Sequence, residues 1–123
     1  MGGRGGESGF TNNKSGMISI SDMPKLEGSE KQIKWAEQIR ADAINTVNNN
    51  IHLAKDRIKQ NRQVQDYRDD LEAYNHIGKQ LGEELKKIDS ASVLINRRET
   101  FSGARINQLA QKLEEAYRRK RRK

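Results

Sequence analysis

The stretch SEKQIKWAEQIRADAINTVNNNIHLAKDRIKQ, residues 29–60, decides the fold class. Its apolar residues recur at the period of an α-helix: Ala36, Ile39, Ala43, Val47, Ile51, Ala54 and Ile58. Ser29 and Gln32 have the spacing of a capping box, in which each side chain binds the other residue's backbone amide. Asn48, Asn49 and Asn50 are poor helix formers, but the period continues through them. The stretch therefore predicts one long amphipathic helix that begins at Ser29.

A second helical stripe follows at three- and four-residue spacing: Val64, Tyr67, Leu71, Tyr74, Leu81, Leu85 and Ile88. Gly78 stands where an apolar residue is expected, and it could allow another backbone to approach closely. The sequence leaves open whether Gln60–Arg62 forms a turn or whether one helix continues through it. An antiparallel hairpin of the two helices is the simplest way to bury both stripes.

The remaining sequence predicts two further helices. Asp89 or Ser90 can cap a short helix that runs through Arg98, and residues 99–103 read as a turn. A last helix then begins at about Ala104, with one apolar face formed by Ile106, Leu109, Ala110, Leu113, Ala116 and Tyr117. The predicted fold is all-α, with a flexible tail over residues 1–25, a helical domain over 26–117 and a basic tail over 118–123.

Residues 1–25 are rich in Gly, Ser and Asn, which favours a flexible segment. Within them Met17-Ile18-Ser19-Ile20 alternates apolar and polar side chains. This patch is either part of a disordered linker or a strand that adds to the edge of a partner's sheet. Ile18 and Ile20 are therefore candidate protein-interface residues, together with Trp35, which we interpret as a core or interface residue.

Composition limits the possible core and the possible chemistry. Hydrophobic residues make up 33% of the 123-residue chain and charged residues another 33%. This supply suits a narrow seam between helices, so stability from a partner or a second copy is expected. There is no cysteine, and no stretch has the length and apolarity of a membrane span. We therefore expect no membrane association.

The sequence contains no recognisable catalytic or metal-binding motif. His52 and His76 have no second ligand at helical spacing. The neighbouring carboxylates Asp69-Asp70 and Glu83-Glu84 point in different directions on a helix. The N-terminal glycines match no phosphate-binding loop. The sequence thus predicts a protein that is not an enzyme and carries no cofactor or metal.

Positive charge is concentrated at the C-terminus. The formal net charge is +7, and the last six residues carry +6, which leaves 18 basic and 17 acidic residues elsewhere. These six are the primary candidates for nucleic-acid binding: Arg118, Arg119, Lys120, Arg121, Arg122 and Lys123. If all six engaged phosphates, the log–log salt slope of binding would be on the order of −4 to −5. A solubilising tail is the alternative.

Three other arginines are secondary candidates. Arg97 and Arg98 follow an apolar run, and the planar fork of arginine suits phosphate or carboxylate. A structural salt bridge to Glu99 or to the long helices is an equally good interpretation. Arg4 lies in Gly-Gly-Arg-Gly-Gly, one unit similar to the Arg/Gly segments that contact RNA.

Residues 26–40, LEGSEKQIKWAEQIR, resemble a Leu-x-Gly-Ser-Glu-Lys-Gln-x-x-Trp-Ala-x-x-Ile-Arg segment of small proteins from bacteriophages and mobile elements of Gram-positive bacteria. Some of those proteins also begin Met-Gly-Gly-Arg-Gly, as this chain does. Their later Ile-Asp-x-Arg element is similar to Ile95-Asn96-Arg97-Arg98, although this chain has Asn96 in place of the acid and no tryptophan before Ile95. The resemblance covers about 15 residues closely, and it implies an origin rather than an activity.

The resemblance implies a setting in the cytoplasm of a bacterial host. Small helical phage proteins without catalytic residues include anti-CRISPR proteins, many of which are acidic mimics of DNA. Because this chain is basic, we expect instead an inhibitor that binds guide RNA, DNA or an RNA-guided nuclease complex. Two alternatives stay open: a helical protein that assembles with itself or with virion components, and a DNA-binding accessory factor of a mobile element.

Overall fold

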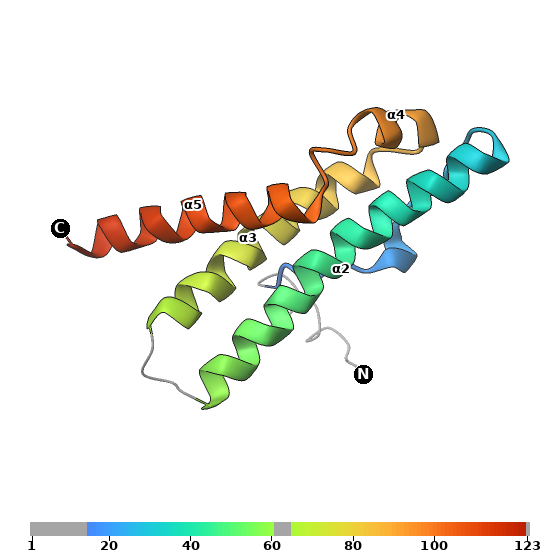
Figure 1. Cartoon of the computed structure of the whole chain (residues 1–123). Coiled ribbons are helices and arrows are strands. Elements are labelled where there is room, and N and C mark those ends of the chain that lie inside the picture. Colours follow the sequence, from blue (N-terminus) through green and yellow to red (C-terminus); the bar gives the residue numbers. More distant parts are fainter. Residues whose placement is uncertain (1–14, 61–64, 123) are drawn as a thin grey trace.

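The computed structural model describes residues 15–60 and 65–122 and confirms an all-α architecture (Figure 1). A single 3-10 turn, η1 (Ile20–Asp22), precedes four α-helices in this part of the chain: α2 (Glu30–Gln60), α3 (Gln65–Lys86), α4 (Ala91–Asn96) and α5 (Gly103–Arg122). Helices α2 and α3 form the predicted antiparallel hairpin, and residues 61–64, which include most of the Gln60–Arg62 stretch left open by the sequence, lie outside the described residues. Helix α5 packs on α3 and runs toward the C-terminus.

The capping box at the start of α2 is confirmed. The Gln32 amide donates to Ser29 Oγ at 3.2 Å, and the Ser29 amide donates to Gln32 Oε1 at 3.1 Å. Gly28 precedes the cap with a φ of +150°, a conformation that favours glycine. Glu27 then pairs with the start of α4, since its amide donates to the Asp89 carbonyl and its carbonyl accepts from the Ala91 amide. These bonds join the beginnings of α2 and α4.

The last two helices differ from expectation at their ends. Helix α4 stops at Asn96, so Arg97 and Arg98 lie in the turns that follow it. Helix α5 begins at Gly103, where the Ser102 hydroxyl accepts from the Arg105 amide at 3.2 Å. It continues to Arg122, so most of the predicted basic tail is a regular part of the helix. The expected boundary at residue 118 is therefore not a structural one.

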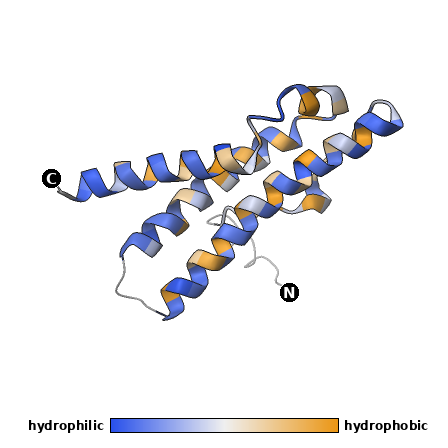
Figure 2. Ribbon diagram, in the orientation of Figure 1, coloured by the Kyte–Doolittle hydropathy of each residue, from blue (hydrophilic) through white to orange (hydrophobic). Residues whose placement is uncertain are grey.

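The core lies where α2, α3, α4 and α5 meet, and Figure 2 shows the apolar residues gathered there. Its largest fully buried side chains are Phe101, Ile51, Leu85, Leu94, Ile106 and Val47. Ala36, Ala43, Ala54 and Ala73 have no exposed surface, which lets the helix axes approach closely. Phe101, in the predicted turn before α5, is a core residue that the helical pattern did not indicate. The buried Phe101 side chain packs in the core and so attaches the α4–α5 connection to the hairpin.

The expected flexible tail over residues 1–25 needs a correction from residue 15 onward. Ile18 is 7% exposed, and its amide and carbonyl both bind the side chain of Asn48 in α2. Pro24 is held through its carbonyl, which accepts from Arg40 Nη1 at 2.8 Å. The segment thus packs on its own hairpin rather than extending as a strand toward a partner's sheet. Residues 1–14 lie outside the described residues.

Candidate nucleic-acid interface

Helix α5 carries the densest positive charge of the described helices. It contains seven basic and two acidic residues, whereas α3, on which it packs, contains six acidic and three basic residues. Ile106 and Ala110 of α5 are buried against the core, and Leu113 and Tyr117 pack beside them. One face of α5 is therefore fixed to the bundle, and its outer face is free to bind a ligand. In Figure 2 the C-terminal end of α5 is hydrophilic.

Two members of the basic run face inward. Arg121 holds the carboxylate of Asp69 in α3 with two parallel bonds, Nη1 to Oδ1 at 2.7 Å and Nη2 to Oδ2 at 2.6 Å. Asp69 is only 5% exposed, and the Arg121 hydrogen bond lowers the pKa of this carboxyl despite its burial. Arg118 lies 4.0 Å from Asp66. These arginines are three residues apart, so they share the face of α5 turned toward α3.

The next members of the run point to solvent. Arg119 and Lys120 are exposed, and Arg119 has only a surface ion pair with Glu115 at 3.7 Å. Lys120 has no ion pair with any residue that the structure describes. Surface pairs of this kind are weak and exchange readily for other anions. Of the six predicted residues, Arg119 and Lys120 are therefore exposed and lightly paired, while the Arg122 side chain and Lys123 lie outside the part of the chain that the structure describes.

Sequence reasoning missed two basic residues on the same outer face. Arg105 and Lys112 precede Arg119 at seven-residue intervals, a spacing that places all three side chains in one row along a helix. Both are exposed, and neither has an ion pair with a described residue. With a rise of about 1.5 Å per residue, the row is about 21 Å long. The seven-residue spacing itself is the signal that could have identified it.

Arg97 and Arg98 are not brought together with the end of the basic run. They precede the start of α5, and the helix separates them from Arg122 by about 30 Å. Arg97 lies 3.7 Å from Glu84 Oε2 and stacks over the Phe101 ring at 5.1 Å. Arg98 donates to the Ile95 carbonyl at 2.8 Å. Their contacts are those of structural arginines, and Arg97 pairs with α3 rather than with Glu99.

The predicted protein-interface residues occupy different environments. Trp35 is half exposed, at 50%, and Arg98 lies over its ring at 5.4 Å. Ile20 is 56% exposed, whereas Ile18 is buried within the chain. Trp35 and Ile20 are therefore accessible to a partner protein, whereas Ile18 is buried in the chain's own core. Arg4 lies outside the described residues.

Glu114 of α5 and Asp70 of α3 form a pair of carboxyl groups beside the inward-facing arginines. Burial and a hydrogen bond with Asp70 raise the pKa of Glu114 in α5 to about 7. Burial, together with the charges of Asp70 and Glu114, raises the pKa of Tyr74 to about 12. The Tyr74 hydroxyl donates to Asn107 Oδ1 at 2.5 Å. The α3–α5 contact is thus sensitive to the protonation of Glu114.

Two other kinds of feature are absent among residues 15–60 and 65–122. No group of three or more His, Cys, Asp or Glu side chains there could hold a metal ion. No described helix is long and apolar enough to cross a membrane. Comparison with protein-family models, with curated proteins and with solved structures gives no match. The candidate site is the outer face of α5, because of its exposed basic residues.

Proposed function

We propose that this protein is a non-enzymatic binding protein whose α5 outer face contacts the phosphate backbone of a nucleic acid. The observation that carries the proposal is the exposed row Arg105, Lys112 and Arg119, and Lys120 adds a separate exposed cation at the C-terminal end of α5. A helix face of this kind offers several cations at about 10 Å intervals along a straight line. Such contacts neutralise phosphates without reading bases, so the recognition would depend on shape and charge.

The division of the basic run limits the number of phosphates bound. Arg121 holds the buried Asp69 carboxylate with two hydrogen bonds and is not free for a ligand, whereas Arg118 has a longer and more exposed pair with Asp66 at 4.0 Å. The row and Lys120 supply about four contacts, so the log–log salt slope should be on the order of −3 to −4. A slope near −5 would require the inward-facing arginines to leave α3.

More specifically, we propose that the protein is phage-encoded and inhibits an RNA-guided nuclease. This proposal is supported by the resemblance of residues 26–40 to small phage proteins and by a basic face that suits guide RNA. Binding of the purified full chain to a structured guide RNA and to a random DNA duplex, followed by guide-directed cleavage assays, tests it. We expect preference for the RNA and reduced cleavage. Tighter binding to the DNA duplex would favour a DNA-binding accessory factor, and unchanged cleavage across several nuclease subtypes would refute the inhibitor.

The alternative of self-assembly through the second helical stripe has less support. Four of its described members, Tyr74, Leu81, Leu85 and Ile88, are buried in the chain's own core, and the other two, Tyr67 and Leu71, are partly buried. They are therefore occupied within one molecule and do not form a free seam for a second copy.

A further inference from the structure

Residues 15–19 lie in a groove between α2 and α3 in an extended form, gripped through their backbone. Asn48 Oδ1 accepts from the Ile18 amide at 2.9 Å, and Asn48 Nδ2 donates to the Ile18 carbonyl at 2.8 Å. Asn75 Oδ1 in α3 accepts from the Gly16 amide at 2.8 Å. One asparagine therefore satisfies both polar groups of a residue, as a neighbouring β-strand would. Bonds of this kind recognise any extended peptide and do not depend on its side chains.

The floor of the groove is made by two glycines of α3. A Cβ on Gly78 would lie 2.0 Å from the Gly16 carbonyl oxygen, and a Cβ on Gly16 would lie 2.3 Å from the Asn75 carbonyl oxygen. At Gly82 a Cβ would meet only Ile18 Cγ1, at 3.7 Å. The floor thus imposes two conditions on an occupant, a glycine at the first position and room for an aliphatic side chain two residues later.

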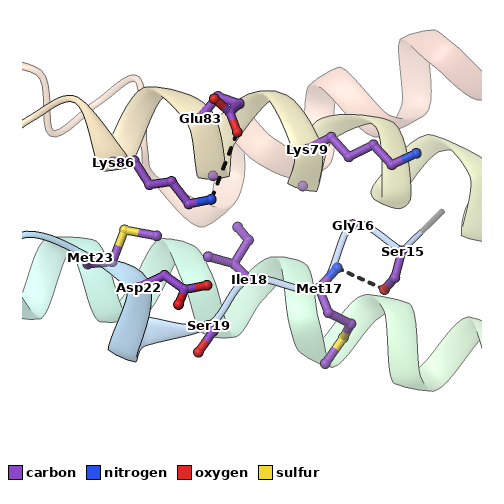
Figure 3. A pocket seen from close by; sticks show the side chains of 12 residues that line it. Ser15, Gly16, Met17, Ile18, Ser19, Asp22, Met23, Lys79, Glu83 and Lys86 are labelled. Atoms are coloured by element: carbon purple, nitrogen blue, oxygen red, sulfur yellow. Dashed lines mark hydrogen bonds and ion pairs between the residues drawn. The ribbon is translucent and has the colours of Figure 1, made fainter. Parts of the chain in front are cut away.

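The groove is not filled by this segment. A hollow of about 810 Å³ continues between the segment and α3. Figure 3 shows Lys79, Glu83 and Lys86 along its α3 wall, with Met17, Asp22 and Met23 opposite. Lys86 and Glu83 form a surface ion pair at 3.9 Å. The wall is therefore polar, and it leaves space beside the peptide for side chains that the chain itself does not supply.

We propose that the α2–α3 groove is a binding site for an extended peptide of a partner protein with the pattern Gly-x-aliphatic, occupied in this chain by Gly16-Met17-Ile18. The occupant's chemistry is read from the segment that fits: backbone bonds to Asn48 and Asn75, glycine against Gly78, and an aliphatic side chain over Gly82. The chain's own segment acts as a competitor. Its effective concentration is on the order of millimolar, so a partner peptide must bind tightly or meet a weakened segment.

A fluorescein-labelled peptide of residues 15–23 tests the proposal on the full chain. In an Ile18→Ser variant the internal segment loses its apolar contact but Asn48 and the glycine floor remain. We expect this variant to bind the labelled peptide at least ~10-fold more tightly than the wild type, because the competitor is weaker. Adding Asn48→Ala should abolish the gain, and a peptide with Gly16→Val should not bind.

The proposal is overturned if the Ile18→Ser variant, with wild-type helicity, fails to bind the peptide or binds both peptides equally. Amide exchange in the wild type provides an independent measurement if that variant does not fold. Millimolar peptide should accelerate exchange of the Ile18 amide, and unchanged exchange would contradict the proposal. A wild-type dimer that dissociates on addition of peptide would also contradict it, since the occupant would then be a second copy.

Discussion

At the scale of single residues, the positive charges near the end of α5 fall into two groups. The inward-facing arginines pair with carboxylates of α3, and the exposed basic residues are available to a ligand. Asp69 is one of two buried charged side chains in the described chain, the other being Arg40. Its carboxylate accepts both guanidinium bonds of Arg121, with Gln65 as a third donor at 3.3 Å. A buried carboxylate that loses such a partner keeps its desolvation cost without compensation. The Arg121–Asp69 pair therefore anchors the end of α5.

Arg121→Ala and Arg119→Ala make a matched pair, because each removes one arginine from the same turn of α5. We expect Arg121→Ala to lower the melting temperature and Arg119→Ala to leave it nearly unchanged, since only Arg121 compensates a buried charge. Thermal unfolding by circular dichroism measures both. Equal melting temperatures for the two variants would show that the pair does not stabilise α5.

The raised pKa of Glu114 predicts an unusual pH dependence of the free energy of unfolding. Its pKa is raised in the folded state to about 7, from 4.5 in the unfolded chain, so its contribution is fully present below pH 4.5 and is lost as the pH rises through 7. Asp69 acts in the opposite sense, because its pKa is lowered on folding and its contribution is lost in acid.

Glu114→Gln removes this titration. We expect it to raise the free energy of unfolding at pH 8 by on the order of 1 kcal/mol, after allowance for solvent screening, and to change it little at pH 4.5. Urea unfolding at the two pH values measures the effect. A gain of the same size at both values would mean that Glu114 does not titrate between them.

At the scale of elements, the sequence predicted each helix because its apolar residues keep one period and because caps are local. The period, the capping box and the basic charge of the C-terminus could all be read without tertiary contacts. The hydrogen bonds of the Asn48 side chain could not be predicted in this way, because their partner, the Ile18 backbone, lies 30 residues earlier in the chain. The sequence also could not show which residues of the basic run pair with α3 and which are exposed, because that depends on α5 packing beside the acidic residues of α3. Close approach of another backbone at Gly78 was expected, and the backbone that approaches is that of Gly16.

The two glycines of α3 give opposite predictions for the same substitution. Gly82→Ala should stabilise the protein by about 0.5–1 kcal/mol, because alanine favours a helix and its Cβ makes an ordinary contact with Ile18. Gly78→Ala should instead destabilise it by about 1–2 kcal/mol, because the gain in helix propensity is smaller than the lost packing of residues 15–19.

Chemical denaturation of the wild type and the two variants compares these effects directly. Amide exchange at Ile18 adds a local readout, which should accelerate in Gly78→Ala only. Stabilisation by both substitutions would show that the segment contributes little to the folded state.

At the scale of the whole molecule, charge is arranged in layers. Acidic α3 packs against both α2 and basic α5, so its negative charge is partly neutralised at these contacts and the positive charge of α5 is displayed outside. The accessible Trp35 lies near the start of α2, at the opposite end from the C-terminus (Figure 1). Only the C-terminal end of the proposed phosphate-binding face is therefore far from Trp35, because Arg98, seven residues before Arg105, lies over the Trp35 ring.

The central claim is that one face of α5, and not net charge alone, binds nucleic acid. Its most direct test is the salt dependence of guide-RNA binding by fluorescence anisotropy for the wild type and two triple variants. One converts Arg105, Lys112 and Arg119 to glutamine. The control converts Lys31, Lys34 and Lys87, which are also exposed and lack ion pairs with described residues. Both variants lose three positive charges.

We predict that the α5 variant binds more weakly and that its log–log salt slope falls in magnitude by about 2–3, because three phosphate contacts are lost. The control should keep a slope close to that of the wild type. If both variants lose the same affinity and slope, binding follows net charge and the α5 face has no special role. If the wild type does not bind at all, nucleic-acid binding by this protein is refuted.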